Sequence, residues 1–334
     1  VSERYGPVST VHLGPWRVVV LCGYDTVTEA LVDQAEELSG RGKQANFNWL
    51  FKGYGLAFGS WERAQQLRRF SITALRDLGV GKRGIEERIQ GEADFLIEAC
   101  RGTHGAFLDP TFFMSRTVSC VISSIVFGGR FDCENKEFLS LLRMMLGSFQ
   151  FTATSTGQLC EMFYSVTKYL PGKTHEEIDK NHQPKFKDGA KMPYTEAVIH
   201  EIQRFDMIPM GPACRITQDT RDFLLSKGAE VFPMLGSMLR DPKLFSNPRD
   251  FNPQHFLDEK GQFKRSDAFV PFFIGKRYCF GEGLASMELF LFLTTIMQNF
   301  HFKSPQSPQD IDVSPKHVGF VTIPQNYTMS FLPR

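Results

Sequence analysis

The chain has 334 residues, of which 42% are hydrophobic and 22% are charged, and its net charge is +1. This composition is that of an ordinary globular protein, long enough to bury a large core. A net charge near zero argues against nucleic-acid binding through a general excess of basic residues. The 32 phenylalanines indicate an interior that is rich in aromatic side chains.

The N-terminal segment predicts two strands followed by a helix. Residues 8–22 are rich in β-branched side chains and are broken by Gly14-Pro15, which predicts two strands joined by a turn. Residues 24–32 predict a helix, with Asp25 or Thr26 as its N-cap. The chain starts VSERYGPVST, without Met, so we expect its start to be truncated.

The rest of the chain predicts helices with a few short strands. Helical periodicity dominates residues 60–151 and returns from Tyr194, whereas residues 223–232 and 318–331 alternate as strands do. The apolar residues 284–300 fall short of the roughly 20 needed to span a membrane and are predicted to form a core helix. The expected fold class is therefore mainly α with small β-sheets.

The cysteines number seven and are scattered along the chain without a CxxC pair. Neither a disulfide framework nor a zinc ribbon is indicated by this pattern. One cysteine, Cys279, stands out because it lies between two aromatic residues in the stretch FFIGKRYCFGEG.

The stretch around Cys279 combines five spaced positions ahead of a long apolar helix: Phe272, Gly275, Arg277, Cys279 and Gly281. Glycines permit tight backbone curvature, and the N-terminus of the following helix favours a negatively charged sulfur. The pattern predicts a thiolate held as ligand to a soft or borderline metal. The alternative, a free cysteine that is simply buried, explains a lone cysteine but not five spaced positions.

Two weaker patterns are also present. Glu201 and Arg204 lie three residues apart on a predicted helix and can pair, although such pairs are common on surfaces. Arg68-Arg69 lies in a predicted helix that begins near Ser60-Trp61, and its plainest interpretation is a solvated basic face.

The sequence resembles the cytochrome P450 family of haem-thiolate monooxygenases, and within it the mammalian subfamily 2A. The resemblance covers nearly the whole chain, from YGPVSTVHLGP through HEIQRF and FNPQHF to DIDVSPKHVGF. It implies a haem cofactor, electrons from NADPH through a flavoprotein reductase, and insertion of one oxygen atom into small apolar or aromatic substrates. It also implies NADPH-cytochrome reductase and cytochrome b5 as partners, no nucleic acid, and the cytoplasmic face of the endoplasmic reticulum membrane, reached through segments absent here.

The resemblance assigns roles to individual positions. Cys279 resembles the axial ligand of haem iron, in the loop formed with Phe272, Gly275 and Gly281, while Arg277 and Arg68 match cations that hold the haem propionates. Glu201 and Arg204 match a buried structural pair, completed by His255 of Pro253-Gln254-His255-Phe256. The positions that match a substrate pocket are Phe47, Phe51, Phe58, Ile208 and Phe320. Basic residues that match a docking face for the reductase are Arg63, Arg69, Lys82, Arg83 and Lys276.

Several departures from the family pattern have consequences. Ser286 and Cys214 stand where cations are expected, and Arg215 is a candidate replacement for the second. The chain is expected to be one incomplete domain, 1–172 joined to 173–334, because on the order of a hundred residues are missing after Gly172. The missing part would carry the distal helix and its Ala/Gly-Gly-x-Asp/Glu-Thr relay, a pattern that occurs nowhere in the sequence. The alternative hypothesis is an inactive shortened isoform that at most binds haem.

Overall fold

The structure is a computed structural model that describes residues 2–14, 16–42, 53–80, 83–128, 135–162, 192–206, 211–220, 223, 225–319 and 321–334. Its helices are α1 (Ser2–Tyr5), α2 (Tyr24–Thr28), α4 (Trp61–Asp77), α5 (Arg83–Gly102), α6 (Thr111–Phe127), α7 (Lys136–Ala153), α8 (Ser155–Met162), α10 (Pro193–Asp206), α11 (Leu235–Leu239) and α12 (Glu282–Asn299). A π-helix η1 (Glu29–Asp33) and the 3₁₀ turns η3 (Pro253–Phe256) and η4 (Gly275–Arg277) complete the set.

The main sheet has five strands in the order β1-β2-β5-β4-β3. These strands are β1 (Val8–Leu13), β2 (Trp16–Leu21), β3 (Gly40–Arg41), β4 (Cys214–Arg215) and β5 (Glu230–Pro233). β2 pairs with β5 in parallel, and the other neighbours pair antiparallel. Two small antiparallel sheets are formed by β6 (Phe300–Lys303) with β9 (Ser330–Pro333) and by β7 (Pro315–Val318) with β8 (Thr322–Pro324). The predicted class, mainly α with small β-sheets, is confirmed.

The N-terminal prediction is right in outline and wrong in detail. Two strands meet at Gly14, whose positive φ of 59° suits the turn between Leu13 and Trp16. The predicted helix is present but changes into the π-helix η1 after Thr28. Its N-cap is Gly23 and not Asp25 or Thr26, and no side chain caps it. The predicted first residue, Tyr24, is the observed one, so the errors concern the N-cap and the type of helix after Thr28.

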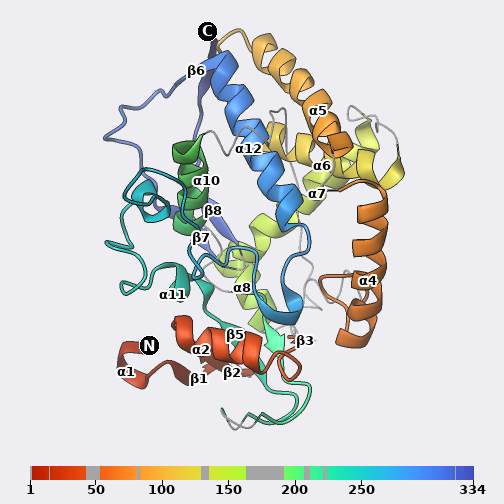
Figure 1. The fold of residues 1–334 in the computed structure, drawn as a ribbon, viewed down its shortest axis with the longest axis vertical. Coiled ribbons are helices and arrows are strands. Elements are labelled where there is room, and N and C mark those ends of the chain that lie inside the picture. Colours follow the sequence, from red (N-terminus) through yellow and green to blue (C-terminus); the bar gives the residue numbers. More distant parts are fainter. Residues whose placement is uncertain are drawn as a thin grey trace.

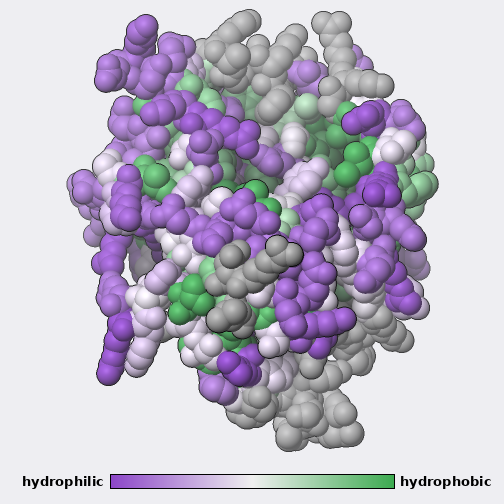
Figure 2. Space-filling view, turned by 60° about the horizontal axis from the view of Figure 1, so that its bottom comes forward, coloured by the Kyte–Doolittle hydropathy of each residue, from purple (hydrophilic) through white to green (hydrophobic). Residues whose placement is uncertain are grey.

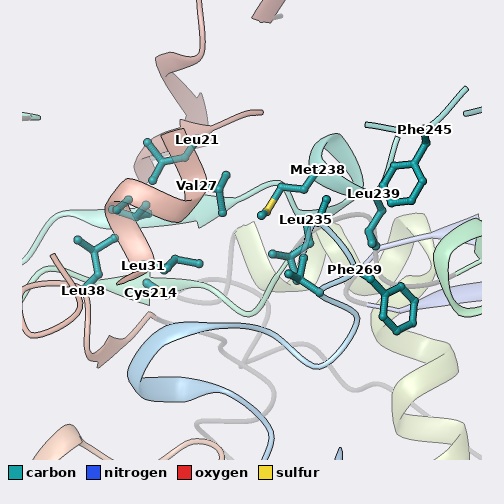
Figure 3. Packing of buried hydrophobic residues seen from close by; sticks show 14 of the residues in the cluster. Leu21, Val27, Leu31, Leu38, Cys214, Leu235, Met238, Leu239, Phe245 and Phe269 are labelled. Atoms are coloured by element: carbon teal, nitrogen blue, oxygen red, sulfur yellow. The ribbon is translucent and has the colours of Figure 1, made fainter. Parts of the chain in front are cut away.

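The core has two large parts, one on the sheet and one between helices. Figure 1 shows the main sheet and α2 at one end of the molecule, with α12 running upward from them toward β6. The first part packs α2, η1 and α11 on the sheet, with Leu31 and Cys214 near one end and Phe245 and Phe269 near the other (Figure 3). The second part joins α5, α6, α10 and α12. The loop that precedes α12 therefore lies where the two parts meet.

Helix α6 exposes apolar side chains along one stripe. Val118, Ile122 and Val126 recur every four residues and are 36%, 42% and 56% exposed, whereas Ile125 on the same helix is buried. On α7 Leu141, Met144 and Met145 are exposed in the same way. A helix that is apolar on most sides is usually buried on most sides, so this exposure is unusual. On the face shown in Figure 2 hydrophobic residues gather in separate patches among hydrophilic ones.

Two observations bear on the cysteines and on membrane spans. Cys22, Cys214 and Cys279 form no disulfide, and Cys120 is disulfide-bonded, which the scattered cysteine pattern did not predict. Within the described ranges, no helix combines the length and the apolar character that crossing a bilayer requires.

Candidate functional site

The loop that carries Cys279 is fixed at its start by close backbone packing. Gly275 has a φ of +70°, and a Cβ at this position would collide with the carbonyl oxygen of Leu31 in η1. Both the conformation and the space therefore require glycine. Next to it, Lys276 Nζ lies 2.5 Å from Glu36 Oε1, which adds a partly exposed ion pair between the same two segments.

Cys279 is held by the backbone and left open at its side chain. Its N–H donates to the carbonyl of Phe272 at 2.8 Å, which closes the loop on itself. The side chain is exposed, and α12 begins three residues later at Glu282 with Gly281 as N-cap. A Cβ at Gly281 would lie 3.7 Å from Cys279 Sγ, in ordinary contact, so glycine keeps the space beside the sulfur clear. The sulfur thus lies just ahead of the positive end of an 18-residue helix.

Arg277 and Arg41 are both anchored by backbone carbonyls and both keep one donor free. Arg277 Nε donates to Ser39 O at 2.7 Å and Nη2 donates to Gly59 O at 3.0 Å. Arg41 Nε donates to Ala57 O at 2.8 Å. Nη1 of each guanidinium is buried and makes no hydrogen bond within the described part of the chain. Two buried donors without acceptors are costly, which marks this place as one built for an anion.

Positive charge is concentrated around Arg41, Arg68 and Arg277. Burial is the main cause that lowers the pKa of Arg277 to about 10, and the charges of Arg41 and Arg68 act in the same direction. Burial likewise lowers the pKa of Arg41; the neighbouring Cys214 opposes this shift and Arg68 adds to it. A bound anion would favour the charged form of both guanidinium groups and raise their pKa values.

Arg68 reaches the Cys279 loop from α4. Its Nη2 donates to the carbonyl of Tyr278 at 2.8 Å, and its guanidinium carbon lies 5.0 Å from the ring centroid of Tyr278 and 5.4 Å from that of Phe280. The sequence pattern alone left a solvated basic face as the plainest interpretation of this arginine. The structure instead joins it to the residues on both sides of Cys279.

Glu201, Arg204 and His255 form one buried network. Arg204 binds Glu201 with two hydrogen bonds, Nε to Oε2 at 2.7 Å and Nη2 to Oε1 at 2.6 Å. The remaining guanidinium N–H groups donate to the carbonyls of Leu239, Pro248 and Asp250. His255 Nδ1 lies 3.2 Å from Glu201 Oε2, and Asn252 N donates to Oε1 at 2.8 Å. Every donor of Arg204 is satisfied. The three predicted residues are therefore in contact inside the protein.

The predicted substrate-pocket residues are mostly outside the described residues. Phe47, Phe51, Ile208 and Phe320 fall there, and so does the junction after Gly172. Phe58 is described and half-buried, two residues before Ser60, the N-cap position of α4. Among the residues that the structure describes, no cluster of three or more His, Cys, Asp or Glu could hold a metal.

Comparison with known proteins decides the family. A family model described as Cytochrome P450 matches residues 1–183 and 173–331. The chain belongs to the cytochrome P450 family. It is 63% identical to Cytochrome P450 2A13 of Homo sapiens and 61% identical to Cytochrome P450 2A3 of Rattus norvegicus. Each alignment covers 100% of this chain and 88% of the relative. P450 enzymes are haem-dependent monooxygenases that take electrons from NADPH through a reductase.

The same comparisons agree with an internal gap. The alignment with Cytochrome P450 2A13 extends over 434 residues, while this chain has 334, a difference of 100. The two family matches meet at residues 173–183, which is where the sequence departs from the P450 pattern. The relatives therefore contain a segment that has no counterpart in this chain.

The residues present fit a haem. The group carries two carboxylates and an iron that needs an axial ligand, and the site offers the free Nη1 groups of Arg41 and Arg277 together with the exposed sulfur of Cys279. Arg41 was missed by the sequence analysis. Its flanking glycines in Ser39-Gly40-Arg41-Gly42 were the available signal, because a Cβ at either glycine would collide with the backbone or side chain of the facing strand.

Cys214 and Ser286 stand where the family pattern has cations, and they lie in different surroundings. Cys214 is fully buried on β4, and burial raises its pKa to about 11 while Arg41 and Arg277 lower it. Arg215 alternates to the other side of the strand, where its Nε lies 3.8 Å from Glu230 Oε1 and the side chain is exposed. Arg215 therefore does not replace a cation at this site. Ser286 lies half-buried on α12.

Proposed function

We propose that this chain binds haem through Cys279 and serves as a monooxygenase for small apolar or aromatic substrates. The observation that carries the proposal is the convergence of an exposed sulfur at the start of α12 with two buried guanidinium donors that lack acceptors. Bound haem iron would supply the activation of O2. The protein's own residues would supply the axial sulfur, hold the propionates through Arg41 and Arg277, and fix the loop.

Electrons would come from NADPH through a flavoprotein reductase, with cytochrome b5 as a second donor. Arg63 and Arg69 lie exposed on α4, the helix whose Arg68 contacts the Cys279 loop, and Lys276 lies in the loop itself. Such a group of basic residues suits an acidic flavoprotein. Lys82 and the side chain of Arg83 fall outside the described residues. We place the protein at the cytoplasmic face of the endoplasmic reticulum membrane, where the same reductase would serve it.

A second candidate function is a haem-binding chain without turnover. It is favoured by the difference of 100 residues from Cytochrome P450 2A13 and by the missing relay pattern. Positioned acids contribute about 10²–10⁴-fold to proton transfer, so a chain without such a relay is expected to be slow even when its haem is correctly ligated.

One experiment separates the two candidates. Haem-loaded chain, reductase, NADPH and coumarin are incubated together, and hydroxylated product, peroxide and NADPH consumption are measured side by side. Product formed in step with NADPH supports the monooxygenase. NADPH consumption that yields peroxide and no product supports the second candidate. A chain that takes up no haem contradicts both.

A further inference from the structure

The Cys279 loop is exposed at Tyr278 and Cys279, and Phe280 after them is half-buried. Arg277, just before them, is 6% exposed and anchored by two carbonyls. After them α12 begins, with Glu282 paired to Arg265 at 3.0 Å. Between these anchors Tyr278 is 44% exposed and Cys279 is exposed as well. Something other than burial must therefore fix the direction in which the sulfur points.

Arg68 makes the contacts that can do this. It comes from α4, 210 residues away in the sequence, and it touches both neighbours of Cys279 at once. The hydrogen bond to Tyr278 O at 2.8 Å holds the backbone, while the guanidinium plane lies near the Tyr278 and Phe280 rings at 5.0 Å and 5.4 Å. Arginine can make both contacts together because its flat group stacks on rings and its N–H groups donate in the plane.

We propose that Arg68 is a positioning residue for Cys279 and acts through Tyr278 and Phe280. With both neighbours held by one rigid group, the peptide of Cys279 between them loses most of its freedom to rotate. The loop is then set before any cofactor arrives, which lowers the ordering cost of binding. This role differs from the propionate contact that the sequence predicted for Arg68, since it needs the shape of the guanidinium and not only its charge. Its importance for haem rests on the proposed function, but the geometric role does not.

The amide of Cys279 gives a direct readout. Its N–H donates to Phe272 O, so its exchange with deuterium requires this loop to open, either locally or together with more of the chain. In the full-length chain without haem, Arg68→Ala should speed exchange in the peptide containing Cys279 about tenfold, since a charged hydrogen bond and two ring contacts are lost. Arg68→Lys keeps the charge and should behave like the alanine variant. Arg69→Ala, one residue away on an exposed position, should leave exchange unchanged.

A double-mutant cycle tests whether Arg68 acts on Cys279 through its contacts with the aromatic rings. Tyr278→Leu removes one stacking partner while its carbonyl stays, so exchange should rise by a smaller factor, and Arg68→Ala should then add less than it does alone. Slow exchange in the core of α12, around the buried Leu291, verifies that each variant is folded. If Arg68→Ala does not fold, Arg68→Met, which keeps an unbranched side chain but has neither a donor nor a charge, takes its place.

Failure of the positioning role and failure of the proposed function would be seen in different measurements. Unchanged exchange at Cys279 in folded Arg68→Ala or Arg68→Met overturns the positioning role, as does equal protection in Arg68→Lys and the parent chain. A parent chain that takes up no haem overturns the proposed function instead, and leaves the exchange result standing. In haem-loaded protein, Arg68→Ala should also broaden or shift the Soret band, a change that a purely structural role elsewhere would not produce.

Discussion

The side chains around Arg204 are fully buried and hydrogen-bonded, whereas a stripe of apolar side chains on α6 is exposed to solvent. At Arg204 every guanidinium donor has an acceptor, and the side chains of Glu201 and Arg204 have no exposed surface. On α6 apolar side chains face solvent at every fourth residue. The first region lies within the second family match, over residues 173–331. The second lies on the N-terminal side of the junction at which 100 residues of the relatives have no counterpart.

This difference indicates that the network of Glu201 and Arg204 is complete within the described residues, whereas α6 carries apolar side chains that no described residue covers. Exposed apolar stripes of this length are normally covered by another element. The missing segment of the relatives is the simplest candidate for that cover. Substitutions in the two regions should therefore change the free energy of unfolding by different amounts.

Replacing Arg204 by Leu should have the largest effect on stability. The change leaves Glu201 buried without its cation, which costs about 3–5 kcal/mol. Soluble yield and haem content should fall together. Chemical denaturation measures the loss of stability, and absorbance measures the bound haem. Arg240→Leu is the matched control, because Arg240 is exposed and makes one hydrogen bond, to Phe205 O. A stable Arg204→Leu chain that retains haem and loses only turnover would show that the network is catalytic.

The second prediction uses two isoleucines of α6 as a matched pair. Ile125 is 1% exposed and Ile122 is 42% exposed, three residues apart on one helix. Ile125→Ala should lower the free energy of unfolding by about 2–5 kcal/mol, while Ile122→Ala should change it by about 0.5 kcal/mol or less. Equal losses in urea denaturation would mean that Ile122 is covered in solution, either by another part of this chain or by a second copy.

Glu288 supplies a third, pH-dependent test within the core. Its side chain is buried on α12, Oε1 has no hydrogen-bond partner among the described residues, and burial raises its pKa to about 8. A carboxyl with a raised pKa keeps its stabilising contribution below its unfolded pKa and loses it as pH rises through the folded value. Stability should therefore fall between pH 5 and pH 8, by at most roughly 3 kcal/mol from this group.

The variant Glu288→Gln should flatten that dependence, because the amide stays neutral at every pH. The melting temperature of the two chains, measured from pH 5 to pH 8, gives the comparison. His200 works in the opposite direction, since burial lowers its pKa and favours stability at higher pH. A fall in stability that persists unchanged in Glu288→Gln would show that another group is responsible.

The sequence allowed the tight turn at Gly275 and the helix after Cys279 to be predicted, because both depend on local residues. The spacing of Gly275, Cys279 and Gly281 encodes the turn, the sulfur and the start of α12 within seven residues. The pairing of Glu201 with Arg204 is also local, three residues apart on one helix. The contact of Arg68 with Tyr278 and the role of Arg41 could not be predicted in this way. They depend on how distant elements pack, which periodicity does not record.

The central claim is that Cys279 ligates haem iron, and the reduced carbon monoxide difference spectrum tests it most directly. The haem-loaded chain should give the long-wavelength Soret band typical of thiolate ligation, and Cys279→Ala should abolish that band while far-ultraviolet circular dichroism stays largely unchanged. A thiolate-type band that survives in Cys279→Ala, or its absence from a folded, haem-loaded parent chain, would contradict the claim.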